Sequence, residues 1–98
     1  MELPLLATGA AAWKAGHAAV RSGTLVLRRS YDITRDDPEI EPELETHAAA
    51  EARGYMRQAV ARLGLTQAQG VRVFMVYMHA YINGVLDEAT GATEGGAE

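Results

Sequence analysis

Three side chains that bind divalent metals recur at intervals of four in the middle of the chain. Glu43, His47 and Glu51 would lie on adjacent turns of one face if this segment is helical. Carboxylates and imidazole are metal ligands, and His79 or His17 could complete such a set. In helical di-iron bundles, however, Glu and His ligands are three residues apart and face inward. This row falls on the polar side of its segment, so we expect a solvated face without metal or other cofactor.

The other two histidines lack the neighbours that catalysis requires. His17 follows Trp13 by one turn in an apolar stripe, which favours a hydrogen-bonded histidine at a packed interface. His79 precedes Asn83 by one turn in a polar strip, which favours a buried polar seam that fixes helix register. A general base needs a nucleophile or a substrate pocket beside it, and the sequence signals neither. The chain also has no cysteine, so it has no thiol nucleophile or disulfide. We therefore expect no catalytic residue and no enzymatic activity.

Acidic side chains are concentrated just before and within the first turns of the second predicted helix. Segment 35–51 carries one arginine against seven acidic residues. The missing EF-hand glycine and two prolines exclude a calcium loop. Carboxylates at alternate positions resemble a row of phosphates, so an acidic inhibitor or adaptor that docks on a basic surface is one alternative function. Its surface would comprise Asp36, Asp37, Glu39, Glu41, Glu43 and Glu45.

The rest of the charge is also unevenly distributed. Segment 52–86 carries four arginines and no acidic residue, while the net charge of the whole chain is −4. This acidic balance argues against nucleic-acid or anionic-membrane partners, and Arg28 and Arg29 are a weak phosphate signal. The apolar start lacks the basic residues of a signal peptide, and polar residues interrupt segment 71–86. We expect a cytoplasmic protein, and the frequent Ala, Gly and Arg suggest a bacterial or phage source.

Three helices follow from hydrophobic periodicity and end signals. The first should span 4–21, with an apolar stripe through Leu6, Trp13 and His17 and an opposite arc of alanine that permits close approach of a second backbone. Gly9 and Gly16 weaken this helix, and tight packing of another segment against both positions would explain them. The second should span 42–63, with proline in its first turn and Gly64 after its end. The third should span 67–89, after the capping box 66–69.

The segment between the first two helices is the only β-like part of the chain. Residues 24–34 alternate imperfectly between apolar and polar, which predicts one extended strand or a short hairpin; the alternative is an extension of the first helix. The fold class is therefore mainly α, a small three-helix domain with a short extended strand or hairpin between helices 1 and 2. This single domain covers residues 1–89, and residues 90–98 form a disordered acidic tail.

The third predicted helix carries more apolar surface than a small domain should need. Its polar residues occupy only a narrow arc, so it is either the central helix of the fold or buries a second face in another molecule. We predict a non-catalytic interaction or assembly subunit that buries helix 67–89 against a second copy or a larger partner. A helical metal-binding protein is the second alternative. The predicted partner interface comprises Trp13, His17, Val73, Phe74, Tyr77, Met78, Tyr81 and Val85.

Overall fold

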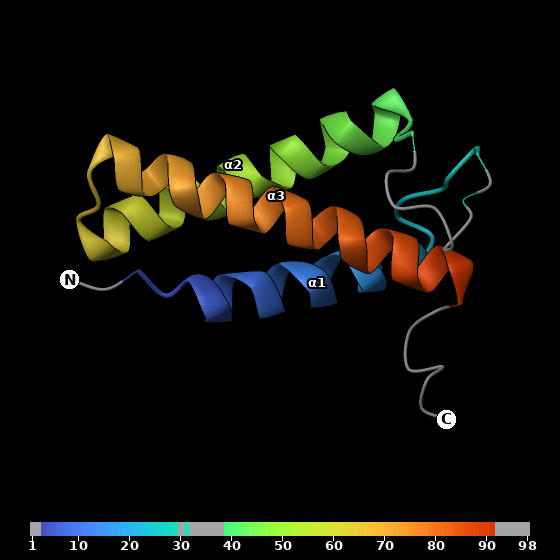
Figure 1. Cartoon of the computed structure of the whole chain (residues 1–98), viewed down its shortest axis with the longest axis horizontal. Coiled ribbons are helices and arrows are strands. Elements are labelled where there is room, and N and C mark those ends of the chain that lie inside the picture. The colour runs from blue at the N-terminus through green and yellow to red at the C-terminus, as the bar shows by residue number, and fades with distance from the viewer. Residues whose placement is uncertain (1–2, 30, 32–38, 92–98) are drawn as a thin grey trace.

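Within the described residues three helices form the fold, as the sequence predicts. A computed structural model describes residues 3–29, 31 and 39–91. Helix α3 is central: α1 runs beside it in the same direction, and α2 runs in the opposite direction (Figure 1). The ends of α1 and α3 lie at the same end of the bundle as the start of α2 (Figure 1). The helices are α1 (Leu5–Arg21), α2 (Pro42–Leu63) and α3 (Gln67–Thr90).

Local signals set the helix ends. Pro42 is the first residue of α2, where its missing N–H costs nothing, and Gly64 ends the helix with a left-handed φ of 67°. At the start of α3, the Thr66 hydroxyl accepts a hydrogen bond from the Gln69 backbone N–H at 3.2 Å. The Gln69 side-chain oxygen accepts one from the Thr66 N–H at 2.9 Å. This reciprocal pair is the predicted capping box and satisfies two otherwise unpaired donors.

Helices α1 and α3 touch through their backbones. A Cβ atom built on Gly16 would lie 2.2 Å from the backbone oxygen of Tyr81. One built on Gly84 would lie 2.2 Å from the backbone oxygen of Trp13. The packed face of α1 is therefore its small-residue face, whereas Leu6, on the predicted apolar stripe, is 91% exposed. The buried residues of α1 are Thr8, Ala12, Gly16 and Ala19.

Helix α2 buries one face, which is formed mostly by small side chains. Leu44, Ala48, Ala52 and Ala59 are buried against α3 and its neighbours. The largest part of the core surrounds Tyr77, Tyr81 and Val85. A smaller cluster lies at the other end of the bundle, where α2 passes into α3, and its buried members are Ala59, Leu65 and Val73.

The predicted strand or hairpin between α1 and α2 is wrong for residues 24–29 and 31, which form no strand. The alternative helix extension is wrong as well, because α1 ends at Arg21. The Leu25 N–H bonds to the Ala19 carbonyl at 3.0 Å, which turns the chain back over the end of α1. The N–H groups of Arg28 and Arg29 bond to a side chain instead of a neighbouring strand, so no ladder forms. Residues 30 and 32–34 lie outside the described part.

No helix in the described part of the chain has the length and apolar character needed to cross a membrane. The predicted tail from residue 92 onward lies outside the described residues.

Candidate functional site

Glu41 does not belong to the predicted acidic surface. Its side chain is only 2% exposed, and it accepts hydrogen bonds from the backbone N–H groups of Arg28 (3.1 Å) and Arg29 (3.0 Å). The Tyr31 hydroxyl donates a further bond at 2.9 Å. Burial by itself raises the pKa of Glu41, but these hydrogen bonds and the charge of Arg29 outweigh it, so the pKa is lowered. Glu41 therefore fixes the connection between α1 and α2.

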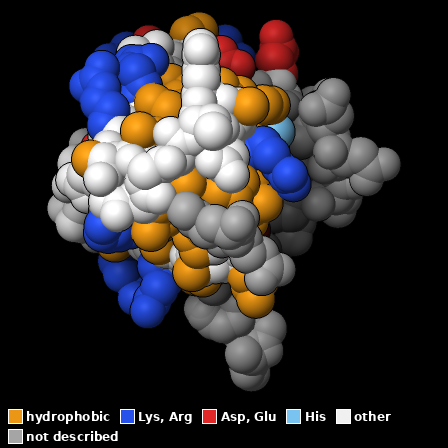
Figure 2. All heavy atoms as spheres, turned by 90° about the vertical axis from the view of Figure 1, so that its left-hand side faces the viewer, with side chains coloured by type: hydrophobic (Ala, Val, Ile, Leu, Met, Phe, Trp, Pro, Cys, Tyr) orange, Lys and Arg blue, Asp and Glu red, His pale blue; other side chains and the backbone are white. Residues whose placement is uncertain are grey.

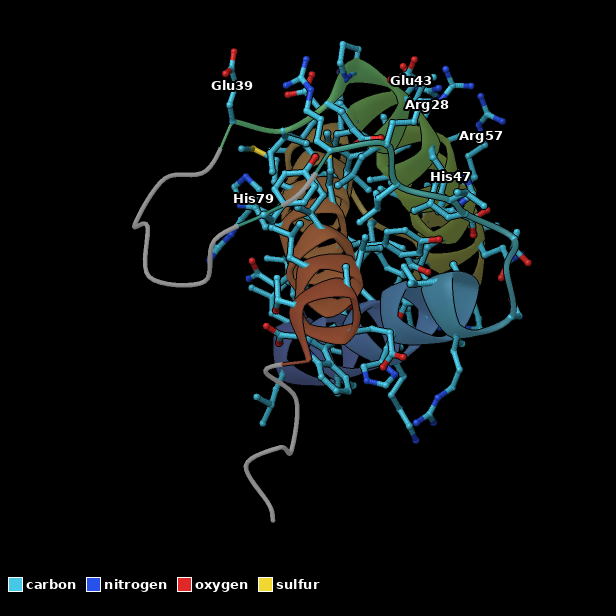
Figure 3. All side chains as sticks on the ribbon, turned by 90° about the vertical axis from the view of Figure 1, so that its right-hand side faces the viewer. Arg28, Glu39, Glu43, His47, Arg57 and His79 are labelled. Carbon is cyan, nitrogen blue, oxygen red and sulfur yellow. The ribbon has the colours of Figure 1, made fainter. Side chains whose placement is uncertain are left out.

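The remaining carboxylates of that prediction have different places. Glu39, Glu43 and Glu45 are exposed, while Asp36 and Asp37 lie outside the described residues. Figure 3 shows Glu39 and Glu43 at the same end of the molecule but well apart from each other. Docking of this segment on a basic surface stays a prediction.

His47 is not on a solvated polar face, contrary to the expectation for the Glu43–His47–Glu51 row. Its Nε2 atom lies 2.7 Å from the Tyr81 hydroxyl oxygen, within hydrogen-bond distance, and the two ring centroids are 5.5 Å apart. Glu43 and Glu51 are exposed. No group of three His, Asp or Glu side chains within residues 3–29, 31 and 39–91 is placed to hold a metal ion. His47 instead ties α2 to the central helix.

Tyrosines continue from this contact along the inside of the bundle. The ring centroids of Tyr77 and Tyr81 are 6.0 Å apart, and those of Tyr55 and Tyr77 are 4.6 Å apart. The Thr8 hydroxyl of α1 donates a long hydrogen bond of 3.4 Å to the Tyr55 hydroxyl. Burial, and next the charge of Glu51, raise the pKa of Tyr81 to about 12 and also raise the pKa of Tyr77. The tyrosine row of Tyr55, Tyr77 and Tyr81 therefore connects α2 and α3, and Thr8 joins it to α1.

A surface pocket of about 300 Å³ opens at one end of the tyrosine row. Glu51, Tyr55 and Gln58 come from one flank of α2, and Tyr77 comes from α3. Gly54 leaves space, because a Cβ atom there would meet nothing within 4 Å. The pocket lining is Ala50, Glu51, Gly54, Tyr55, Gln58 and Tyr77. Sequence reasoning missed this pocket, although the i, i+4, i+7 spacing of its three α2 side chains places them on one face.

The polar contacts between α1 and α3 lie at the end of the close backbone approach. The indole N–H of Trp13 donates to the Asp87 carboxylate at 2.8 Å. Nε2 of His17 lies 2.8 Å from a carboxylate oxygen of Glu88, but its N–H direction does not make a hydrogen bond. Arg21 approaches the same carboxylate at 3.9 Å. His17 thus lies at a packed junction, as its stripe position predicts, but this junction is within the chain.

The predicted buried seam on α3 is wrong. His79 and Asn83 are exposed, and Figure 3 shows His79 on the opposite side of α3 from His47. Asp87, one turn after Asn83, accepts a hydrogen bond from Trp13 of α1 instead.

The predicted partner interface overlaps the core of the chain itself. Four of its residues are buried inside the bundle: Val73, Tyr77, Tyr81 and Val85. Trp13 and His17 are half-buried at the junction with α3, and Phe74 and Met78 are half-buried on α3. Partner binding by these residues stays a prediction, but Val73, Tyr81 and Val85 cannot meet a partner while the bundle is intact.

Another set of apolar residues on α3 does face outward. Val71 is 48% exposed and Met75 is 50% exposed. Met78 and Ile82 follow at helical spacing, but they are half-buried and also pack against the core cluster around Tyr77, Tyr81 and Val85. Positions i, i+4, i+7 and i+11 share one face of a helix. We call Val71, Met75, Met78 and Ile82 the outer stripe. The wide apolar arc of the third predicted helix indicates such a stripe, but hydrophobic periodicity does not distinguish the outer stripe from the face that packs in the core.

No protein-family model matches this chain, and neither does any curated protein or solved structure. Evidence on function therefore comes from the chain's own surfaces. The two candidates are the outer stripe of α3 and the pocket beside the tyrosine row.

Proposed function

We propose that this chain is a non-catalytic interaction subunit that binds a partner protein through the outer stripe of α3. The observation that supports the proposal most directly is the half exposure of Val71 and Met75 on a helix that already packs against both other helices. The chain's own fold uses much of the wide apolar arc of α3, and Val71 and Met75 of the outer stripe are the residues that remain exposed.

The composition of the outer stripe suits binding. An apolar side chain that passes from half-exposed to buried contributes about 1 kcal/mol, at about 25 cal/mol per Å² of apolar area. Met75 and Met78 are flexible and polarizable, so they adapt to the shape of an apolar partner surface. Figure 2 shows the end of the bundle at which α3 begins, where hydrophobic side chains lie among polar ones and Lys and Arg side chains lie towards the edges.

Charge favours a partner helix over a second copy of this chain. Arg72 and His79 are exposed beside the outer stripe, and segment 52–86 contains no acidic residue. If two copies paired antiparallel through their outer stripes, Arg72 of each copy would lie towards His79 of the other, and segment 52–86 would supply no acidic residue to offset the arginine. An amphipathic helix with an apolar face and acidic flanks would complement both the stripe and its rim.

A comparison of three forms of the protein tests this function. The wild type, Met75→Glu and Ala11→Glu serve as affinity baits in the native host, and each captured protein is then purified and titrated against all three. Ala11 is an exposed residue of α1, so its variant adds the same charge elsewhere on a helix. We expect a purified partner whose affinity falls at least tenfold with Met75→Glu and stays unchanged with Ala11→Glu.

Two results would contradict the proposal. A purified partner that binds Met75→Glu as tightly as the wild type would place the interface elsewhere. A homodimer, seen by light scattering at micromolar concentration and dispersed by Met75→Glu, would assign the outer stripe to self-association. Circular dichroism of each variant establishes that the helices are retained.

A further inference from the structure

The pocket beside the tyrosine row has a composition suited to a positively charged group. One carboxylate (Glu51), one amide (Gln58) and two tyrosines line it, and no lysine, arginine or histidine does. A site with one acid and aromatic walls attracts cations, because the ring faces carry partial negative charge and the carboxylate carries a full one.

The two aromatic side chains are held in place by the fold. Tyr77 is only 6% exposed and its ring lies 4.6 Å from that of Tyr55, at an angle of 31°. Tyr55 is itself held by the hydroxyl of Thr8 from α1. The two rings therefore lose little conformational freedom when a ligand binds, which reduces the entropy cost of binding.

Glu51 supplies the negative charge of the pocket lining. After burial, the charge of Glu51 is the next largest cause that raises the pKa of Tyr77, and it acts on Tyr81 in the same way. A negative charge that disfavours tyrosinate at these positions favours a cation beside them.

Space limits the size of the ligand. The pocket volume is about 300 Å³, the lower end of the range for small-molecule sites. Ala50 and Gly54 contribute little side-chain volume to the pocket lining, and a Cβ atom on Gly54 would meet no atom within 4 Å. A compact group fits this space, whereas a large ligand would extend into solvent.

We propose that this pocket binds a small organic cation, an ammonium or guanidinium group, between the carboxylate of Glu51 and the rings of Tyr55 and Tyr77. The cation is either a free amine or guanidine or the arginine side chain of a bound peptide, since each presents a compact organic cation. The pocket involves the Glu51 flank of α2 and not the outer stripe, so this proposal does not depend on the proposed function.

Titration followed by nuclear magnetic resonance tests the proposal. Ethylguanidinium chloride is added to the full-length, isotope-labelled protein, with sodium chloride at equal ionic strength as the reference. We expect saturable shifts at Gly54, Tyr55 and Tyr77, with a Kd on the order of 1–10 mM. A blocked arginine dipeptide is titrated in parallel, and tighter binding of the dipeptide would identify a peptide side chain as the source.

Two variants and two controls make the result specific. Glu51→Gln should weaken binding about tenfold, because the amide keeps the shape and removes the charge. Gly54→Leu should abolish binding by filling the pocket, and it should fold because the site around Gly54 is open. Glu43→Gln, an exposed carboxylate two turns earlier on α2, and Met75→Glu on the outer stripe should both bind like the wild type.

The proposal is overturned if ethylguanidinium causes no saturable shift beyond the sodium chloride reference. It is also overturned if Glu51→Gln binds as tightly as Glu43→Gln, because the carboxylate would then have no role. Unchanged binding by a folded Gly54→Leu variant would place the cation outside this pocket.

Discussion

The close approach of α1 and α3 predicts a large effect from one added methyl group. In Gly16→Ala, the new Cβ would lie 2.2 Å from the Tyr81 backbone oxygen and 3.1 Å from the Val85 backbone nitrogen. An ordinary contact begins at 3.4 Å, so the two helices must separate by about 1.2 Å at this point. Both neighbouring atoms belong to helical backbone, so no side-chain rotation can relieve the contact.

The free energy of this separation can be estimated. A gap of about 0.5–1 Å removes roughly a quarter to a half of the dispersion energy of each contact that it opens. Overpacking usually costs about 1–3 kcal/mol, and a backbone contact belongs at the upper end. Alanine returns about 1 kcal/mol through its higher helix propensity. We expect Gly16→Ala to lower the free energy of unfolding by about 2 kcal/mol or more, a large share of the roughly 5–15 kcal/mol typical of a domain.

Urea unfolding followed by circular dichroism measures the effect, with Gly9→Ala as the matched control on the same helix. A Cβ atom on Gly9 would meet only the Val76 Cγ1 atom, at 3.9 Å. Gly9→Ala should therefore stabilise the protein by up to about 1 kcal/mol. If Gly16→Ala is as stable as the wild type or more stable, α1 and α3 are not in backbone contact and the reasoning fails.

Three further variants test the polar contacts. Glu41→Gln should lower the free energy of unfolding by about 2 kcal/mol at neutral pH. The folded pKa of Glu41 lies below its usual value of 4.5, so the wild type should lose this stability as the pH falls through the folded pKa, whereas the variant should not. Trp13→Phe removes the bond to Asp87 and should lower the melting temperature by an amount equivalent to about 2 kcal/mol; an unchanged value would mean that the bond contributes nothing. Tyr81→Phe removes the bond to His47 and should cost about 1 kcal/mol in urea unfolding. The folded pKa of Tyr81 is about 12, against an ordinary 10.0, so its stabilising contribution should be complete below pH 10 and should fall as the pH rises from 10.0 to about 12. Free energies of unfolding of the wild type and Tyr81→Phe that become equal below pH 10 would contradict this prediction.

The helices could be predicted closely because their signals are local. The capping box at Thr66, the proline that begins α2 and the glycine that ends it act over three or four residues, whatever the rest of the chain does. The observed third helix, Gln67–Thr90, ends within one residue of the predicted span.

The roles of individual polar residues could not be predicted in the same way. In sequence, Glu41 is one of four glutamates at alternate positions and has nothing to distinguish it. Its burial depends on the segment after α1, which returns to place two backbone N–H groups and a tyrosine hydroxyl around it. His47 was assigned to solvent for a similar reason, because its partner Tyr81 comes from another helix.

Local patterns in the sequence predict where the helices form, and they indicate that α3 carries more apolar surface than one contact face needs. Which faces pack depends on how the helices pair in space. On α1 the small-residue face with Gly16 is buried and the larger Leu6 is exposed, because the missing side chain lets two backbones touch. That choice turns the core side of α3 toward α1 and α2 and leaves Val71 and Met75 outside. Hydrophobicity along a chain shows how much apolar surface exists, but the pairing of helices in space determines which part of it remains for a partner.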